Sequence, residues 1–275
     1  MRFKKHSVIV NGRRTFYWEK NSSKKEIVVL LHGFPGNHEG LVDMANSLGN
    51  YRLVIPDLPA CGQSDLLDGK YSLENYAKWL NAFFEGLLIN QAIVIGHSFG
   101  SRVALVFTER YPEKVKKLVL ITPVVKVEGL ISKAVAIEYK IAELLPRKLR
   151  KLWLSNQIHR KVSDIVLFKS ASPKRRKEIT AKDIKERKNF NPQINLELFS
   201  EFYKYSLVPI GKKIKTESLV IAADMDIIAP LNSVKELANQ LANVKFVIMK
   251  HSGHIVVLER PLATANIIRN WLNYD

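Results

Sequence analysis

The stretch Ala92-Ile-Val-Ile-Gly-His-Ser-Phe-Gly100 decides how this chain folds. Its first four residues have the length and composition of a buried strand, and helical spacing of apolar residues begins at Ser98. Gly96 to Gly100 matches G-x-S-x-G, in which the serine lies on a strained strand-to-helix turn and the glycines avoid clashes with neighbouring backbone. Such a turn lifts the Ser98 hydroxyl out of the sheet and places it at a helix N-terminus, which favours developing negative charge.

The segments on both sides of this turn alternate between strand-like and helix-like patterns. Ser7 to Val10 and Thr15 to Trp18 predict a hairpin around an Asn11-Gly12 turn. Alternating strands and helices further on predict an α/β fold with a mostly parallel, twisted sheet and helices on both faces. The later strands are expected at 26–31, 52–56, 92–95, 117–121, 218–222 and 245–249, and the helices at 39–48, 73–88, 98–110, 233–241 and 261–274.

One long basic segment interrupts this alternation. Residues 124–216 hold 22 lysines and arginines against 9 aspartates and glutamates, so they carry +13 of the formal net charge of +17. We interpret the segment as an insertion into one α/β domain that consists of residues 1–123 and 217–275. Helix-like spacing within the insertion, interrupted by prolines, predicts a helical cap, or lid, over the sheet.

The composition indicates the cellular compartment of the protein and excludes some kinds of disulfide and metal site. Cys61 is the only cysteine among 275 residues, which excludes an intramolecular disulfide and a multi-cysteine metal site. The longest apolar runs are far shorter than the roughly 18 residues that suggest a membrane span, and the N-terminal run is too short for a secretory signal. We therefore expect a cytoplasmic protein without integral membrane association.

A serine hydroxyl needs a base to become a nucleophile, usually a histidine oriented by a carboxylate. Asp226 and His254 each follow an expected strand, in the chain order serine, acid, histidine that G-x-S-x-G enzymes use. The carboxyl ends of parallel strands meet at one edge, so both side chains are expected near Ser98. Asp224 and His251 are the alternatives for the acid and the base.

The negative charge that forms during attack on a carbonyl needs two preorganised donors. The backbone N–H of Phe99 is one candidate, and that of Phe34 is the other, because Pro35 has no N–H. His32 and His97 flank the loop and the nucleophile, and we interpret both as residues that hold loops in place.

Five motifs together resemble the α/β-hydrolase superfamily, in the branch of small cap-bearing serine esterases and C–C bond hydrolases. They are His32-Gly-Phe-Pro-Gly36, Asp57-Leu-Pro-Ala-Cys-Gly-Gln-Ser64, Gly96-His-Ser-Phe-Gly100, Asp226-Ile-Ile-Ala-Pro230 and Ser252-Gly-His254.

The resemblance covers almost the whole chain outside the cap. It implies the α/β-hydrolase fold with Ser98 as nucleophile, Asp226 as the acid of a D-x-x-x-P motif and His254 as the base. One departure is Ala60-Cys61, where relatives commonly have Gly-His. This departure concerns the wall of the pocket more than the three catalytic candidates.

These residues predict a serine hydrolase that cleaves a carboxylic ester of a small molecule through an acyl-enzyme, with no cofactor and no metal. One alternative is a C–C bond hydrolase of an anionic diketone-type substrate, which would suit a basic cap. Another is a ligand receptor with a vestigial triad, because the fold alone does not fix the function.

The basic run Lys174-Arg-Arg-Lys177 lies within the expected cap. A run of charge is usually a solvated helix face, and that interpretation is favoured here. Attraction of an anionic substrate or surface is the alternative. Specific recognition of nucleic acid is not expected, because no aromatic residues are interleaved with the charges.

Overall fold

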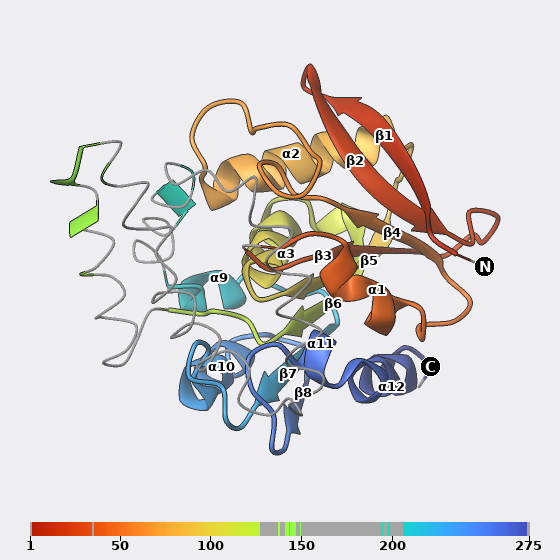
Figure 1. Ribbon diagram of the computed structural model, residues 1–275. Coiled ribbons are helices and arrows are strands. Elements are labelled where there is room, and N and C mark those ends of the chain that lie inside the picture. The colour runs from red at the N-terminus through yellow and green to blue at the C-terminus, as the bar shows by residue number, and fades with distance from the viewer. Residues whose placement is uncertain are drawn as a thin grey trace.

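A computed structural model describes residues 2–34, 36–126 and 206–273, with a few further residues between 137 and 198. The described residues form one sheet in the order β1-β2-β4-β3-β5-β6-β7-β8 (Figure 1). Its strands are β1 (Lys4–Val10), β2 (Arg13–Lys20), β3 (Ile27–Leu31), β4 (Arg52–Pro56), β5 (Ala92–His97), β6 (Val115–Ile121), β7 (Ser218–Ala223) and β8 (Val244–Met249).

The sheet is antiparallel at one edge and parallel elsewhere. Strands β1 and β2 form a hairpin, β2 pairs antiparallel with β4, and all pairs from β4 through β8 are parallel. Asn11 and Gly12 both have positive φ, 49° and 75°, as a two-residue hairpin turn requires. The predicted mostly parallel sheet with an N-terminal hairpin is therefore confirmed.

Helices cover both faces of the sheet, as predicted (Figure 1). Alternate residues of β5 point to opposite faces: Val94 belongs to one apolar cluster, and Ile93 and Ile95 belong to the other. The first cluster packs under α2, α3 and α10, and the second under α1, α11 and α12. The helical elements are α1 (Glu39–Ala45), α2 (Leu73–Gly86), α3 (Phe99–Arg110), η1 (Pro112–Lys114), α9 (Val208–Gly211), α10 (Leu231–Ala238), α11 (Val256–Glu259) and α12 (Pro261–Leu272).

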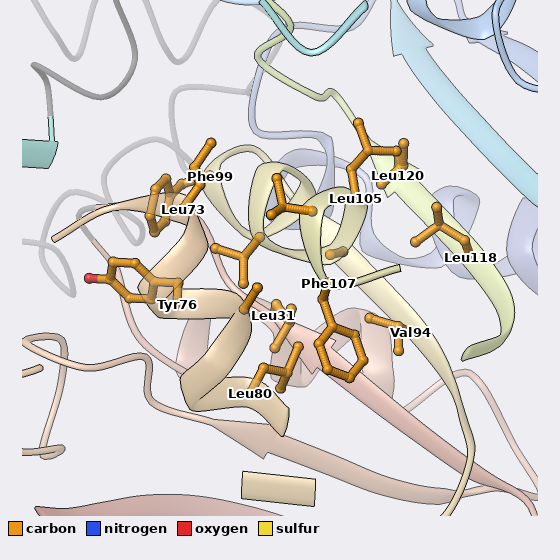
Figure 2. Packing of buried hydrophobic residues seen from close by; sticks show 14 of the residues in the cluster. Leu31, Leu73, Tyr76, Leu80, Val94, Phe99, Leu105, Phe107, Leu118 and Leu120 are labelled. Carbon is orange, nitrogen blue, oxygen red and sulfur yellow. The ribbon is translucent and has the colours of Figure 1, made fainter. Parts of the chain in front are cut away.

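Aromatic side chains fix α2 against α3 directly beside the G-x-S-x-G turn. Figure 2 shows Leu73 and Tyr76 of α2 close to Phe99, the first residue of α3. The rings of Tyr76 and Phe99 meet edge to face with centroids 5.1 Å apart, and both side chains are buried. Burial of a large apolar side chain stabilises the fold by roughly 1.5–3 kcal/mol. The start of α3 is therefore a rigid part of the core.

The two ends of the 124–216 segment meet next to α3. The backbone N–H of Leu207 donates to the carbonyl of Val125 at 2.9 Å, and the buried guanidinium of Arg102 donates to the carbonyl of Val124 at 2.6 Å. Helix α9 follows directly after Leu207. Most of the predicted cap, including Lys174 to Lys177, lies outside the described residues.

In the part of the chain that the structure describes, no helix is both long and apolar enough to cross a lipid bilayer.

Candidate active site

Ser98 lies on a sharp turn between β5 and α3. Its φ of 53° is positive, which is uncommon for a residue other than glycine. A Cβ on Gly96 would lie 2.4 Å from the carbonyl oxygen of Gly100, and one on Gly100 would lie 2.2 Å from that of Leu31. The backbone N–H of Ser98 donates to the carbonyl of Ile121 at 3.0 Å. The turn is therefore packed against backbone on both sides, which holds the serine in its strained conformation.

His254 lies in the loop between β8 and α11, with its ring directed at Ser98. The Oγ of Ser98 lies 2.8 Å from Nε2 of His254. Both residues are buried, at 7% and 5% exposure. The distance is within the range over which a histidine can accept a hydroxyl proton.

Asp226, in the loop after β7, completes a chain of hydrogen bonds. Its Oδ2 lies 2.8 Å from Nδ1 of His254, and its Oδ1 accepts from the N–H groups of Ile228 and Ala229, each at 2.8 Å. A carboxylate at Nδ1 keeps the proton on that nitrogen, so Nε2 is free to accept from the Ser98 hydroxyl. The carboxylate therefore selects the tautomer that a general base needs.

The alternative acid and base lie elsewhere. Asp224 accepts from the backbone N–H of Ser252 at 3.2 Å. Desolvation alone would raise the pKa of Asp224, but the N–H groups of Ser252 and His251, together with the nearby charge of Lys250, lower it below its usual value. His251 is exposed. The geometry thus brings Asp226 and His254, and neither neighbour, to Ser98.

The loop after β3 runs directly against the nucleophile. A Cβ on Gly33 would lie 3.1 Å from the Cβ of Ser98, so a larger residue would crowd the serine. Phe34 follows Gly33, and its ring meets that of Phe99 edge to face at 6.2 Å between centroids. The two predicted oxyanion donors, the N–H groups of Phe34 and Phe99, therefore belong to segments that adjoin Ser98. Pro35 lies outside the described residues.

His32 ties this loop to the end of β4. Its Nε2 accepts from the N–H of Leu58 at 3.0 Å, so its Nδ1 carries the proton that is donated to the carbonyl of Gly33 at 2.8 Å. Burial lowers the pKa of His32, which keeps the ring neutral. The ring thus acts as a bridge between two loops at the carboxyl edge of the sheet.

The loop from Asp57 to Ser64 contains Ala60-Cys61 where similar proteins commonly have Gly-His, and its backbone is strained at Ala60. Ala60 has a φ of 65°, a conformation that suits glycine. The neighbouring Cys61 is buried, and desolvation raises the pKa of its thiol to about 12. The thiol is therefore protonated at neutral pH and is not a nucleophile.

Thr122, directly after β6, is a site residue that the sequence analysis did not identify. Its Oγ1 donates to the backbone carbonyl of His254 at 2.9 Å, and Nε2–H of His97 donates to the same carbonyl at 3.2 Å. The sequence signal is weak, because a threonine between a strand and Pro123 is an ordinary strand end. The positive φ of Thr122, 41°, is visible only in the structure.

The described residues contain no group of three or more His, Cys, Asp or Glu side chains placed to hold a metal ion.

Similarity to known proteins covers most of the chain. The chain is 27% identical to human monoacylglycerol lipase ABHD6 over 267 residues, which covers 90% of this chain and 75% of that protein. It is 25% identical to Lipase 1 of Psychrobacter immobilis over 265 residues, 95% of this chain and 81% of that protein. Among solved structures, a thermophilic esterase from Thermogutta terrifontis matches with a TM-score of 0.81 and 18% identity, over 98% of each chain.

A model of the family described as the alpha/beta hydrolase fold matches residues 26–261. That range contains every element from β3 to α11, together with Ser98, Asp226 and His254. This chain belongs to the α/β-hydrolase fold family.

Proposed function

We propose that this protein is a serine hydrolase that cleaves a carboxylic ester of a small molecule through an acyl-enzyme. Ser98 is the nucleophile, His254 the general base, and Asp226 orients the base. The observation that carries this proposal is the buried chain of two 2.8 Å hydrogen bonds from Ser98 through His254 to Asp226. The lipase relatives support ester hydrolysis.

In the acylation step, Ser98 Oγ attacks the ester carbonyl carbon while His254 Nε2 takes the hydroxyl proton. The N–H groups of Phe34 and Phe99 stabilise the oxyanion, a contribution of about 10²–10³-fold in kcat per donor in other enzymes. The C–O bond of the ester breaks as His254 protonates the leaving alcohol. Water, deprotonated by His254, then attacks the acyl-enzyme, and the acid leaves as Ser98 regains its proton.

The surroundings of the nucleophile favour an apolar part in the substrate. Phe34 packs against the apolar cluster that contains Phe99, and the same cluster includes Ile194 and Leu198 from the 124–216 segment. The segment between the two core pieces therefore contributes apolar side chains to this face of the sheet. Phe34 is only partly buried and follows Gly33 beside Ser98, so it favours an ester with an apolar acyl group over an ester with a charged one.

The charge of the 124–216 segment favours a second candidate. A surplus of +13 would attract an anionic substrate, as in the hydrolysis of a C–C bond in a diketone acid. The three proposed catalytic residues could serve that reaction with a carbon leaving group. An aminopeptidase is less favoured, because binding of a substrate ammonium group calls for acidic residues.

A substrate panel separates the two candidates. Purified protein is given p-nitrophenyl esters of graded acyl length and, in parallel, a dienolic diketone acid. We expect saturable release of p-nitrophenol by the wild type and none above background by Ser98→Ala. Rapid turnover of the diketone acid alone would overturn the ester assignment in favour of C–C bond hydrolysis.

A further inference from the structure

The backbone carbonyl of His254 is held by two donors from different strands. Thr122 Oγ1 follows β6 and donates at 2.9 Å, and His97 Nε2–H, at the end of β5, donates at 3.2 Å. All three residues are buried, and Thr122 has no exposed surface. Both donors therefore act, away from water, on the backbone of the residue whose ring serves as the base.

Thr122 also belongs to the segment that holds the nucleophile. The carbonyl of Ile121 accepts the N–H of Ser98 at 3.0 Å, and the N–H of Thr122 donates to the carbonyl of Ile221 in β7 at 2.8 Å. The dipeptide Ile121-Thr122 thus contacts the backbone of Ser98, the backbone of His254, and the strand that precedes Asp226. This short segment therefore contacts the backbones of Ser98 and His254 directly, and it pairs with β7, the strand that leads to Asp226.

The backbone of Thr122 is strained at the position where it makes these contacts. A φ of 41° is a genuine outlier for a β-branched residue. Strain of this kind persists where surrounding contacts hold it in place and is concentrated at functional sites. At Thr122 this strain accompanies the hydrogen bond from Oγ1 to the backbone carbonyl of His254, the proposed base.

His97 is suited to a fixed donor role. Desolvation, together with the neighbouring His254, lowers the pKa of His97 to about 3. The ring therefore stays neutral while His254 gains and loses its proton. Its bond to a carbonyl requires the proton on Nε2, so one tautomer serves throughout the reaction.

We infer that Thr122, assisted by His97, is a positioning residue that sets the distance and angle of the His254 ring relative to Ser98. This inference rests on the proposed function, because it assigns a purpose to the placement of the base. Misplacement of a catalytic group by about 1 Å can cost about 100-fold in rate. Removal of the Thr122 hydroxyl should therefore slow acylation in protein that remains folded.

The test compares substitutions that differ in one hydroxyl. Thr122→Val removes the donor but keeps the branched shape, and Thr122→Ser restores the donor. Thr108→Val is the matched control, because Thr108 is equally buried, on α3, and its hydroxyl donates to the carbonyl of Ala104 at 2.7 Å. His97→Leu and His97→Gln form a second pair, since the glutamine amide can replace the Nε2–H donor.

The rate constant of Ser98 labelling by a fluorophosphonate, per folded protein and across pH, is the kinetic readout. We expect labelling of Thr122→Val to be between about 10-fold and 100-fold slower, with Thr122→Ser and Thr108→Val close to the wild type. Equal rates and equal pH profiles for Thr122→Val and Thr108→Val would overturn the inference, even if both melt at lower temperature.

A spectroscopic readout keeps the test independent of activity. The Nδ1–H proton between His254 and Asp226 should give a strongly downfield NMR resonance, which we expect to shift in Thr122→Val and to return in Thr122→Ser. If wild-type Ser98 is not labelled, the proposed function fails, and this resonance still decides the positioning role. An unchanged resonance in Thr122→Val would overturn that role.

Discussion

Oδ2 of Asp226 lies 2.8 Å from Nδ1 of His254, while Asp224, two residues earlier, binds the backbone N–H of Ser252. An amide at position 226 would still fit but would favour the wrong imidazole tautomer. We therefore expect Asp226→Asn to lower kcat by about 10⁴-fold. Asp224→Asn keeps an acceptor for Ser252 and should have nearly wild-type kcat. A larger loss in Asp224→Asn than in Asp226→Asn would reverse the assignment of the acid.

Two glycines, Gly100 at the nucleophile turn and Gly40 in α1, predict opposite effects of a substitution by alanine. In Gly100→Ala the new Cβ would lie 2.2 Å from the carbonyl oxygen of Leu31, so we expect a loss of about 3 kcal/mol or more in the free energy of unfolding. Gly40, in α1, has open space around it, and Gly40→Ala should gain up to about 1 kcal/mol. Urea denaturation measures both. Tolerance of Gly100→Ala would show that the turn is not packed as described.

Ala60 offers a test of backbone strain. At a φ of 65° an alanine is disfavoured by about 1–2 kcal/mol. This cost is larger than the cost of the additional conformational entropy that a glycine at this position would lose on folding. We expect Ala60→Gly to raise the free energy of unfolding by about 0.5–1 kcal/mol. Ala82→Gly, within helix α2, should lower it by about the same amount. Destabilisation by both changes would contradict the strained conformation at Ala60.

Buried His97 makes stability depend on pH with a defined sign. Its folded-state pKa of about 3 lies below the unfolded value of about 6.5, so the unfolded chain binds the extra proton in this range. The contribution of neutral, buried His97 to the free energy of unfolding is complete above pH of about 6.5. It is lost as the pH falls toward about 3, and the free energy of unfolding then changes by at most about 1.4 kcal/mol per pH unit.

Urea titrations between neutral and acidic pH measure this slope in the wild type and in His97→Gln. We expect the free energy of unfolding to fall less steeply with falling pH in His97→Gln. The difference in slope should be at most about 1.4 kcal/mol per pH unit, the amount that one titrating group contributes. Equal slopes in the wild type and in His97→Gln would show that His97 gains a proton as readily in the folded protein as in the unfolded chain, which would contradict the lowered pKa.

The charge of the 124–216 segment predicts a salt effect on substrate capture. If this charge steers an anionic ester, kcat/KM for that ester should fall as salt rises from low ionic strength, since the Debye length shortens to about 8 Å at 0.15 M. A neutral ester of similar size should be nearly unaffected. The same salt response for both esters would leave the charge without a role in catalysis.

The sequence predicted the sheet and the grouping of the three catalytic candidates well, because both follow from local patterns. The apolar run before Gly96 and the helical spacing after Ser98 define β5 and α3 with shifts of at most two residues at their ends. Asp226 and His254 were predictable near Ser98 because carboxyl ends of parallel strands share one edge.

Features that depend on three-dimensional contacts could not be predicted in this way. The preference for Asp226 over Asp224 depends on how the turn after β7 directs two similar side chains, although the family motif favoured the former. The donor role of Thr122 depends on a positive φ and on a carbonyl 132 residues away in the chain. The short helices α9 and α11, of four residues each, carry too few apolar positions to show a helical period.

The central claim is that Ser98 is a nucleophile activated by His254. Incubation of the folded wild type with a fluorophosphonate, followed by mass analysis of the Ser98 peptide, tests it directly, with His254→Ala as the comparison. We predict stoichiometric labelling at Ser98 in the wild type and strongly slowed labelling in His254→Ala. Absence of label in the folded wild type, as a ligand receptor with an inactive triad would give, or equal labelling of both proteins, would contradict the claim.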